Sequence, residues 1–176
     1  MWLGVAALDA FLSSIRAKPM HWSHYGGAVV FLVNLFVTYI MCGALWLTQL
    51  SYYPLLGVVG RLDREVYDAA EHAHIRRVSG VAWLMLSIEL ATSALLLWTR
   101  PRAFAFPAAL AGLALIVLIW LSTLGLQNRY HKMLAVAFRP EIQRLLVQTN
   151  WIRVVAWTAR VFILMSVIGR LLRDAA

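Results

Sequence analysis

The chain has 176 residues, of which 62% are apolar and only 14% are charged. A soluble domain of this length carries roughly a quarter of charged residues, so the composition excludes an ordinary soluble domain and indicates an integral membrane protein. The net charge of +8 comes with no nucleic-acid-binding motif, and the basic residues cluster beside apolar segments, where they face lipid phosphates. We therefore expect one membrane domain over residues 1–176, with the lipid bilayer and no nucleic acid as its partner.

The first segment, residues 1–17, has apolar positions at helical spacing. It lacks the basic start of a signal peptide and contains Asp9 within its apolar part. This pattern predicts a short helix that lies in the membrane interface.

Four later segments are apolar enough to cross the bilayer, at about 28–50, 79–98, 104–126 and 150–172. A helix needs ~20 residues to span the ~30 Å hydrocarbon layer. Such a segment must be helical, because lipid offers no hydrogen bonds and every backbone amide must bond within the segment. The sequence therefore predicts an all-α, integral membrane four-helix bundle.

The connections between the spans are unequal. Spans two and three are joined by the short "TRPRA" turn, whereas about 59–78 and 128–148 carry apolar residues at helical spacing. We expect these two connections to be amphipathic helices that lie at the membrane interface on one side of the bundle. The strings "WLTQ" and "WLST", and then "HIRRVSGVAW" and "NWIRVVAW", fall at matching places of the two halves and indicate a degenerate tandem repeat.

Charged side chains within the spans are the strongest functional signal. Each costs about 2.5–3.5 kcal/mol on insertion. Glu89 and Arg160 both lie roughly 15 Å into spans that start on the same side, so they are placed to form an ion pair near mid-membrane. Arg153 lies on the same helical face as Arg160, nearer the surface. The pair either fixes the register of two helices or lines a polar pocket open to the side of the long connections.

A second set of polar residues converges on that side. Glu71 and His74 have the i, i+3 spacing that lets a carboxylate and an imidazole bind one metal, and Glu89 and His131 are candidate further ligands. These ligand types suit a transition metal such as iron, copper or zinc. The alternative is that Glu71 pairs with Arg76 or Arg77 on a wet helix face. Candidate substrate-binding residues at the same mouth are Gln49, Tyr53, Gln127, Asn150 and Arg153.

The strings "TQLSYYPLLGVVG", "HIRRVSGVAWLMLSIELAT", "YHKML" and "TNWIRVVAWTAR" carry a family resemblance. With them the chain resembles small four-span bacterial membrane proteins of the anthrone-oxygenase-like family of unknown function. The resemblance implies a multi-pass protein of the bacterial inner membrane, and its anthrone-oxidising members imply oxidation of an aromatic, membrane-soluble molecule. Relatives show a histidine pair spaced H-x-x-H before the second span, where this chain has Glu71 and His74.

Three functions follow from these patterns as hypotheses. The first is a small membrane oxidoreductase that uses a polar or metal-binding pocket between the spans. The second is a non-catalytic accessory subunit of a larger membrane complex, and the third is a binder of a lipid, quinone or pigment. The partners to be distinguished are further copies of this chain in a homo-oligomer and other proteins in a membrane complex; a multi-protein assembly favours the accessory subunit, and a homo-oligomer counts against it.

Overall fold

The computed structural model describes residues 24–175, and these residues form helices and turns without any strand. The predicted interfacial helix at 1–17 lies outside the described residues. The elements, in chain order, are α2 (His24–Leu47), the π-helical turn η1 (Thr48–Tyr52), α3 (Tyr53–Leu62), α4 (Arg64–Thr99), α5 (Phe106–Ser122), the π-helical turn η2 (Thr123–Gln127), α6 (Asn128–Val136) and α7 (Pro140–Ala175).

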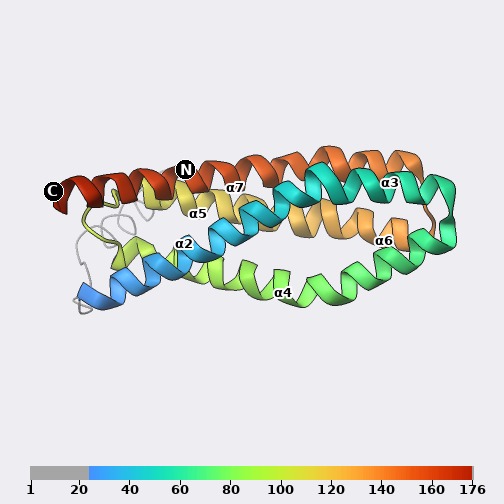
Figure 1. The fold of residues 1–176 in the computed structure, drawn as a ribbon. Helices are drawn as coiled ribbons and strands as arrows, with labels where there is room; N and C mark the ends of the chain where they lie inside the picture. The colour runs from blue at the N-terminus through green and yellow to red at the C-terminus, as the bar shows by residue number, and fades with distance from the viewer. Residues whose placement is uncertain (1–23, 176) are drawn as a thin grey trace, which may run out of the picture.

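Four continuous helices cross the length of the molecule (Figure 1). The apolar stretches Gly26–Leu62, Arg64–Thr99, Phe106–Val136 and Pro140–Asp174 are each long and apolar enough to span a bilayer. The prediction of an all-α membrane bundle is therefore confirmed, and the chain is a multi-pass membrane protein by the length and composition of its helices. The α3–α4 and α6–α7 turns lie at one end of the bundle, and the α4–α5 turn and the C-terminus lie at the other (Figure 1).

The two amphipathic connections differ from the prediction. Residues 59–78 and 128–148 do not form separate helices, because a turn divides each range, at Asp63 and at 137–139. The residues on either side of each turn continue the neighbouring spans as helical extensions. At 1.5 Å per residue, the 36 residues of α4 extend about 54 Å, well beyond the ~30 Å hydrocarbon layer. Apolar side chains of α3, α4, α6 and α7 pack on each other at this end of the bundle, with Tyr53, Leu56, Tyr67, Leu134 and Leu146 buried in one cluster.

Each extension is closed by a tight turn. Asp63 has an extended backbone and caps α4, since its side chain accepts a hydrogen bond from the backbone amide of Val66 at 3.1 Å. Ala137 is likewise extended, and Pro140 starts α7. The Arg64 guanidinium donates to the carbonyl of Val136 at 3.0 Å, which joins the two tips.

Both halves of the chain share one order of elements: a helix, a π-helical turn, a short helix, a tight turn and a helix of 36 residues. This order agrees with the predicted internal repeat. In η1 the amide of Tyr53 bonds to the carbonyl of Thr48 five residues back, and Pro54, which has no amide hydrogen, follows directly. The π-helical turns bury Gln49 and Gln127, and such turns often mark functional sites.

The packing of α4 is uneven along its length. It packs on α2 and α5, but it barely contacts α6. Figure 1 shows α4 diverging from α5 and α6 over its middle part. The site described next lies between these elements.

Candidate functional site

The first polar group lies deep in the bundle and is called the inner layer; its members are Asn34, Thr38, Glu89, Thr92, Ser93 and Arg160. Its centre is the ion pair that helical depth predicts, with Arg160 Nε 2.9 Å from Glu89 Oε1. Glu89 is fully buried and Arg160 is 2% exposed, so both charges are removed from solvent and lipid. Such a pair is tolerated only when its remaining donors and acceptors are also bonded.

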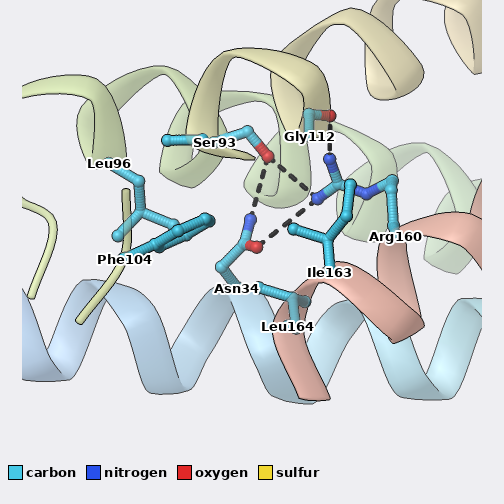
Figure 2. Close-up of a pocket in the computed structure, with 9 residues that line it drawn as sticks. Asn34, Ser93, Leu96, Phe104, Gly112, Arg160, Ile163 and Leu164 are labelled. Atoms are coloured by element: carbon cyan, nitrogen blue, oxygen red, sulfur yellow. Dashed lines mark hydrogen bonds between the residues drawn. The ribbon is translucent and has the colours of Figure 1, made fainter. Parts of the chain in front are cut away.

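The inner layer meets that requirement. Arg160 donates through Nη1 to the Gly112 carbonyl and through Nη2 to Ser93 Oγ at 3.0 Å (Figure 2). Glu89 accepts hydrogen bonds from Thr38 Oγ1 at 2.7 Å and from the Trp157 indole at 2.9 Å. The adjoining cavity has a volume of about 10 Å³, room for about one water.

Apolar packing closes the inner layer toward the C-terminal end of the bundle. Phe31, Leu96, Phe104 and Leu164 are buried there, and Figure 2 shows Leu96, Phe104 and Leu164 beside Asn34. No polar path continues from Arg160 through this cluster of described residues. The inner layer therefore holds helices together, and its geometry leaves no room for a substrate.

The second polar group lies nearer the α3–α4 and α6–α7 turns and is called the outer layer; its members are Gln49, Tyr53, Glu71, Gln127, His131, Asn150 and Arg153. Three of them form a hydrogen-bonded chain. His131 Nδ1 lies 2.5 Å from Glu71 Oε1, and His131 Nε2 lies 3.3 Å from the Tyr53 hydroxyl. Because Glu71 is 1% exposed, a carboxylate is buried directly behind the imidazole.

Arg153 of α7 completes the outer layer. Its Nε donates to Asn150 Oδ1 at 2.9 Å, and its Nη2 lies 3.3 Å from Gln127 Oε1 and 3.5 Å from the Tyr53 hydroxyl. Asn150 in turn donates to Gln49 Oε1 at 2.7 Å. The five residues predicted to bind substrate are thus brought into one network by α7 and the two π-helical turns.

The outer layer borders a cavity of about 410 Å³, which we call the outer cavity. Ligand sites typically enclose about 300–1,000 Å³ with mainly apolar walls and a few convergent polar groups. Tyr53, Gln127, His131 and Arg153 line it on one side, and the Trp157 ring forms part of its inner wall. Apolar wall residues from α2 and α4 are Met41, Leu45, Ile75, Val78, Ala82, Trp83 and Leu86.

Trp157 lies between the inner layer and the outer cavity. Its indole nitrogen bonds to Glu89, while its side chain lines the outer cavity. The side chain is fully buried. It therefore separates the inner ion pair from the space that a ligand would occupy.

Two further tyrosines lie at the outer layer, and sequence reasoning missed one of them, Tyr67. The hydroxyls of Tyr52 and Tyr67 and the Glu71 Oε2 atom are buried without a hydrogen-bond partner among the described residues. Tyr52 stacks on His74, with ring centroids 4.2 Å apart. Tyr67 could have been found from the sequence, because it lies one helical turn before Glu71 on the same face.

The four predicted metal ligands are not assembled. His74 stacks on Tyr52, Glu71 bonds to His131, and Glu89 lies about 27 Å further along α4 than Glu71. Among residues 24–175 no group of three or more His, Cys, Asp or Glu side chains is placed to hold a metal ion. The residues present therefore do not fit the predicted four-ligand transition-metal site. The alternative pairing of Glu71 with Arg76 or Arg77 gives way to its bond with His131.

No protein-family model, curated protein or solved structure matches this chain.

Proposed function

We propose that the chain binds a membrane-soluble molecule in the outer cavity and exchanges a proton with it through Tyr53 and His131. The single observation that carries the proposal is the Tyr53–His131–Glu71 chain of hydrogen bonds on the wall of that cavity. An imidazole held between a buried carboxylate and a hydroxyl is the arrangement of an oriented general base.

The direction of transfer follows from the contacts. Glu71 accepts the hydrogen on His131 Nδ1, which leaves Nε2 to accept the hydrogen of the Tyr53 hydroxyl. A ligand hydroxyl in the cavity gives its proton to the Tyr53 oxygen as Tyr53 gives its own to His131. The resulting imidazolium is paired with Glu71, and the ligand oxyanion is left near Arg153.

The same contacts support an oxidoreductase acting on a membrane-soluble molecule as a second candidate. Oxidation of an aromatic hydroxyl releases a proton, and the chain from Tyr53 to Glu71 accepts one. Tyr53, His131 and Glu71 account for the proton only, so this candidate requires a separate electron acceptor such as a quinone or dioxygen. The accessory-subunit hypothesis has no comparable contact in its favour.

Extraction of the purified protein tests the proposal. Mass spectrometry of the organic extract is expected to find a specific small molecule with the wild-type protein and at least tenfold less with His131→Gln. His72→Gln is the matched control, because His72 is exposed and bonds only to the carbonyl of Asp68 one turn back.

Infrared spectroscopy of the molecule added back is expected to show it ionised when bound to the wild type and protonated when bound to His131→Gln. No proton is released to the solution, because His131 keeps the proton that the ligand loses. Equal extracts from the two histidine variants, with the bound molecule equally ionised in both, would contradict the proposal.

A further inference from the structure

We infer that the bound molecule is a single-chain amphiphile with an acidic oxygen head group, and that it reaches the outer cavity sideways from the bilayer between α4 and α6. The inference rests on the proposed function and adds to it the charge class of the ligand and its route.

The charge of the cavity wall selects the head group. The titratable side chains of the wall, apart from Tyr53, are His74, His131, Lys132 and Arg153, and no Asp or Glu of the described residues lines it. Glu71 lies behind His131, and Glu89 lies beyond Trp157 with its charge paired to Arg160. The wall is therefore basic. A carboxylic acid or phosphate monoester that loses its proton there becomes an anion beside Arg153 and the protonated His131.

Arg153 is the residue best placed to hold that anion. The hydrogen bonds of the described residues occupy its Nε and Nη2 atoms and leave Nη1 without a described partner. A guanidinium binds carboxylate and phosphate oxygens through parallel N–H donors. The Tyr53 hydroxyl, 3.5 Å from Nη2, offers the head group a second contact.

The remaining wall fits an apolar chain. Ile75, Val78, Ala82 and Trp83 of α4 face Ala135 of α6 across the cavity. These positions of α4 lie where its apolar span begins, so we expect this wall to lie near the edge of the hydrocarbon layer. A ligand with its head group at Arg153 has an apolar path for its tail toward the lipid.

The cavity reaches the surface between α4 and α6. Val78 is 43% exposed and Lys132 is also exposed, although both line the cavity, and the two helices barely contact each other. Figure 1 shows α4 separated from α6 over this part. Exposed Arg76, Arg77 and Arg129 flank the lining residues in sequence and draw anionic head groups to the opening.

Binding of oleate and of oleyl alcohol to the purified protein in phosphatidylcholine nanodiscs tests the head-group class. The wild type is expected to bind oleate at least tenfold more tightly than the alcohol. Arg153→Gln is expected to lose at least tenfold in oleate binding while alcohol binding is unchanged. Arg144→Gln, an exposed charge on α7 outside the wall, is the matched control and is expected to bind like the wild type.

A second variant tests the same head-group contact in case Arg153→Gln does not fold. Lys132 is exposed, so Lys132→Gln keeps the fold, and it is expected to weaken oleate binding about threefold.

Competition with inorganic phosphate distinguishes a lipid ligand from a free anion. At millimolar concentration, phosphate is expected not to displace oleate. Equal binding of acid and alcohol, unchanged oleate binding in both variants, or displacement by phosphate would each overturn the inference. The proposed function would still be supported if the bound molecule is ionised in the wild type and protonated in His131→Gln.

The route has its own test. Val78→Trp narrows the opening and is expected to slow the transfer of oleate from vesicles at least fivefold. Val81→Trp places the same ring on the lipid-facing side of α4, where Val81 is 57% exposed, and is expected to leave the rate unchanged. Equal rates in the two variants would overturn the lateral route.

Discussion

The inner and outer polar layers contain the same kinds of side chain but differ in what surrounds them. In both, a buried carboxylate of α4 is bonded to a basic side chain of another helix: Glu89 to Arg160 in the inner layer and Glu71 to His131 in the outer layer. The inner pair is enclosed by further hydrogen bonds and by apolar packing. The outer pair borders a cavity of about 410 Å³ and has Glu71 Oε2 without a described partner.

The difference shows that an ionisable residue within the membrane does not by itself mark a functional site. Glu89 and Arg160 are the deeper and more conspicuous charges, yet their hydrogen-bonding capacity is used within the protein. Tyr53 and His131 are less costly to bury than a charged pair, and together with Arg153 they adjoin space for a ligand. Residual hydrogen-bonding capacity beside a cavity is the better criterion.

Breaking the inner pair is expected to have the largest effect. Arg160→Leu leaves Glu89 buried without its cation and is expected to destabilise the bundle by about 3–5 kcal/mol. The double variant Glu89→Leu with Arg160→Leu removes both charges and is expected to recover much of that loss. Unfolding in mixed micelles measures both, and a single variant as stable as the wild type would contradict a structural role for the pair.

Neutralising the outer carboxylate is expected to change activity more than stability. Glu71→Gln keeps the side-chain size but removes the charge that supports the His131 imidazolium. Proton exchange with the bound molecule is expected to slow about 10²-fold, whereas the unfolding free energy falls by only about 1–3 kcal/mol. Glu65→Gln, an exposed residue in the first turn of α4, serves as the control. Unchanged proton exchange in Glu71→Gln would remove Glu71 from the proposed mechanism.

Filling the outer cavity is expected to weaken ligand binding without changing the stability that depends on the inner layer. Ala82→Phe places a ring in the cavity without touching the inner pair, and ligand binding is expected to weaken at least tenfold at an unchanged melting temperature. Leu84→Phe is the control, because Leu84 is 57% exposed on the lipid-facing side of α4. Full ligand binding by Ala82→Phe would show that the ligand lies elsewhere.

The smallest effect is expected at Trp157, which contacts Glu89 of the inner layer and also lines the outer cavity. Trp157→Phe removes the indole donor to Glu89 but keeps an aromatic wall for the cavity. A loss of about 1 kcal/mol in stability is expected from the missing hydrogen bond, with ligand binding within a factor of about three. If ligand binding falls by much more than a factor of about three while the loss of stability stays near 1 kcal/mol, the main role of Trp157 is to form the wall of the outer cavity.

Helical geometry explains why the inner pair could be predicted and the outer chain could not. Glu89 and Arg160 lie at equal depths of two spans with the same direction, so counting residues was sufficient to place them together. Glu71 and His74 have metal-ligand spacing, but Glu71 faces α6 while His74 faces Tyr52. The choice of neighbour depends on helix rotation, which spacing along one helix does not report.

The π-helical turns are the main reason for this limit. Each inserts an extra residue into a span, at Thr48–Tyr52 and at Thr123–Gln127, and so rotates the helix that follows. Tyr53 and His131 both lie beyond such a turn, so a regular helical period does not give their direction. The extensions at 59–78 and 128–148 were misplaced for a related reason, since an amphipathic face fits lipid or another helix equally well by pattern.

The sequence by itself determined the class of protein, its four apolar helices and the depth of the charges within them. It could do so because a bilayer requires long apolar helices and because helical rise converts residue number into depth. Only the tertiary structure decided that Glu71, His131, Tyr53 and Arg153 border one cavity while Glu89 and Arg160 close on each other. Those pairings depend on the rotation and separation of helices, which are set by packing of side chains from all four spans.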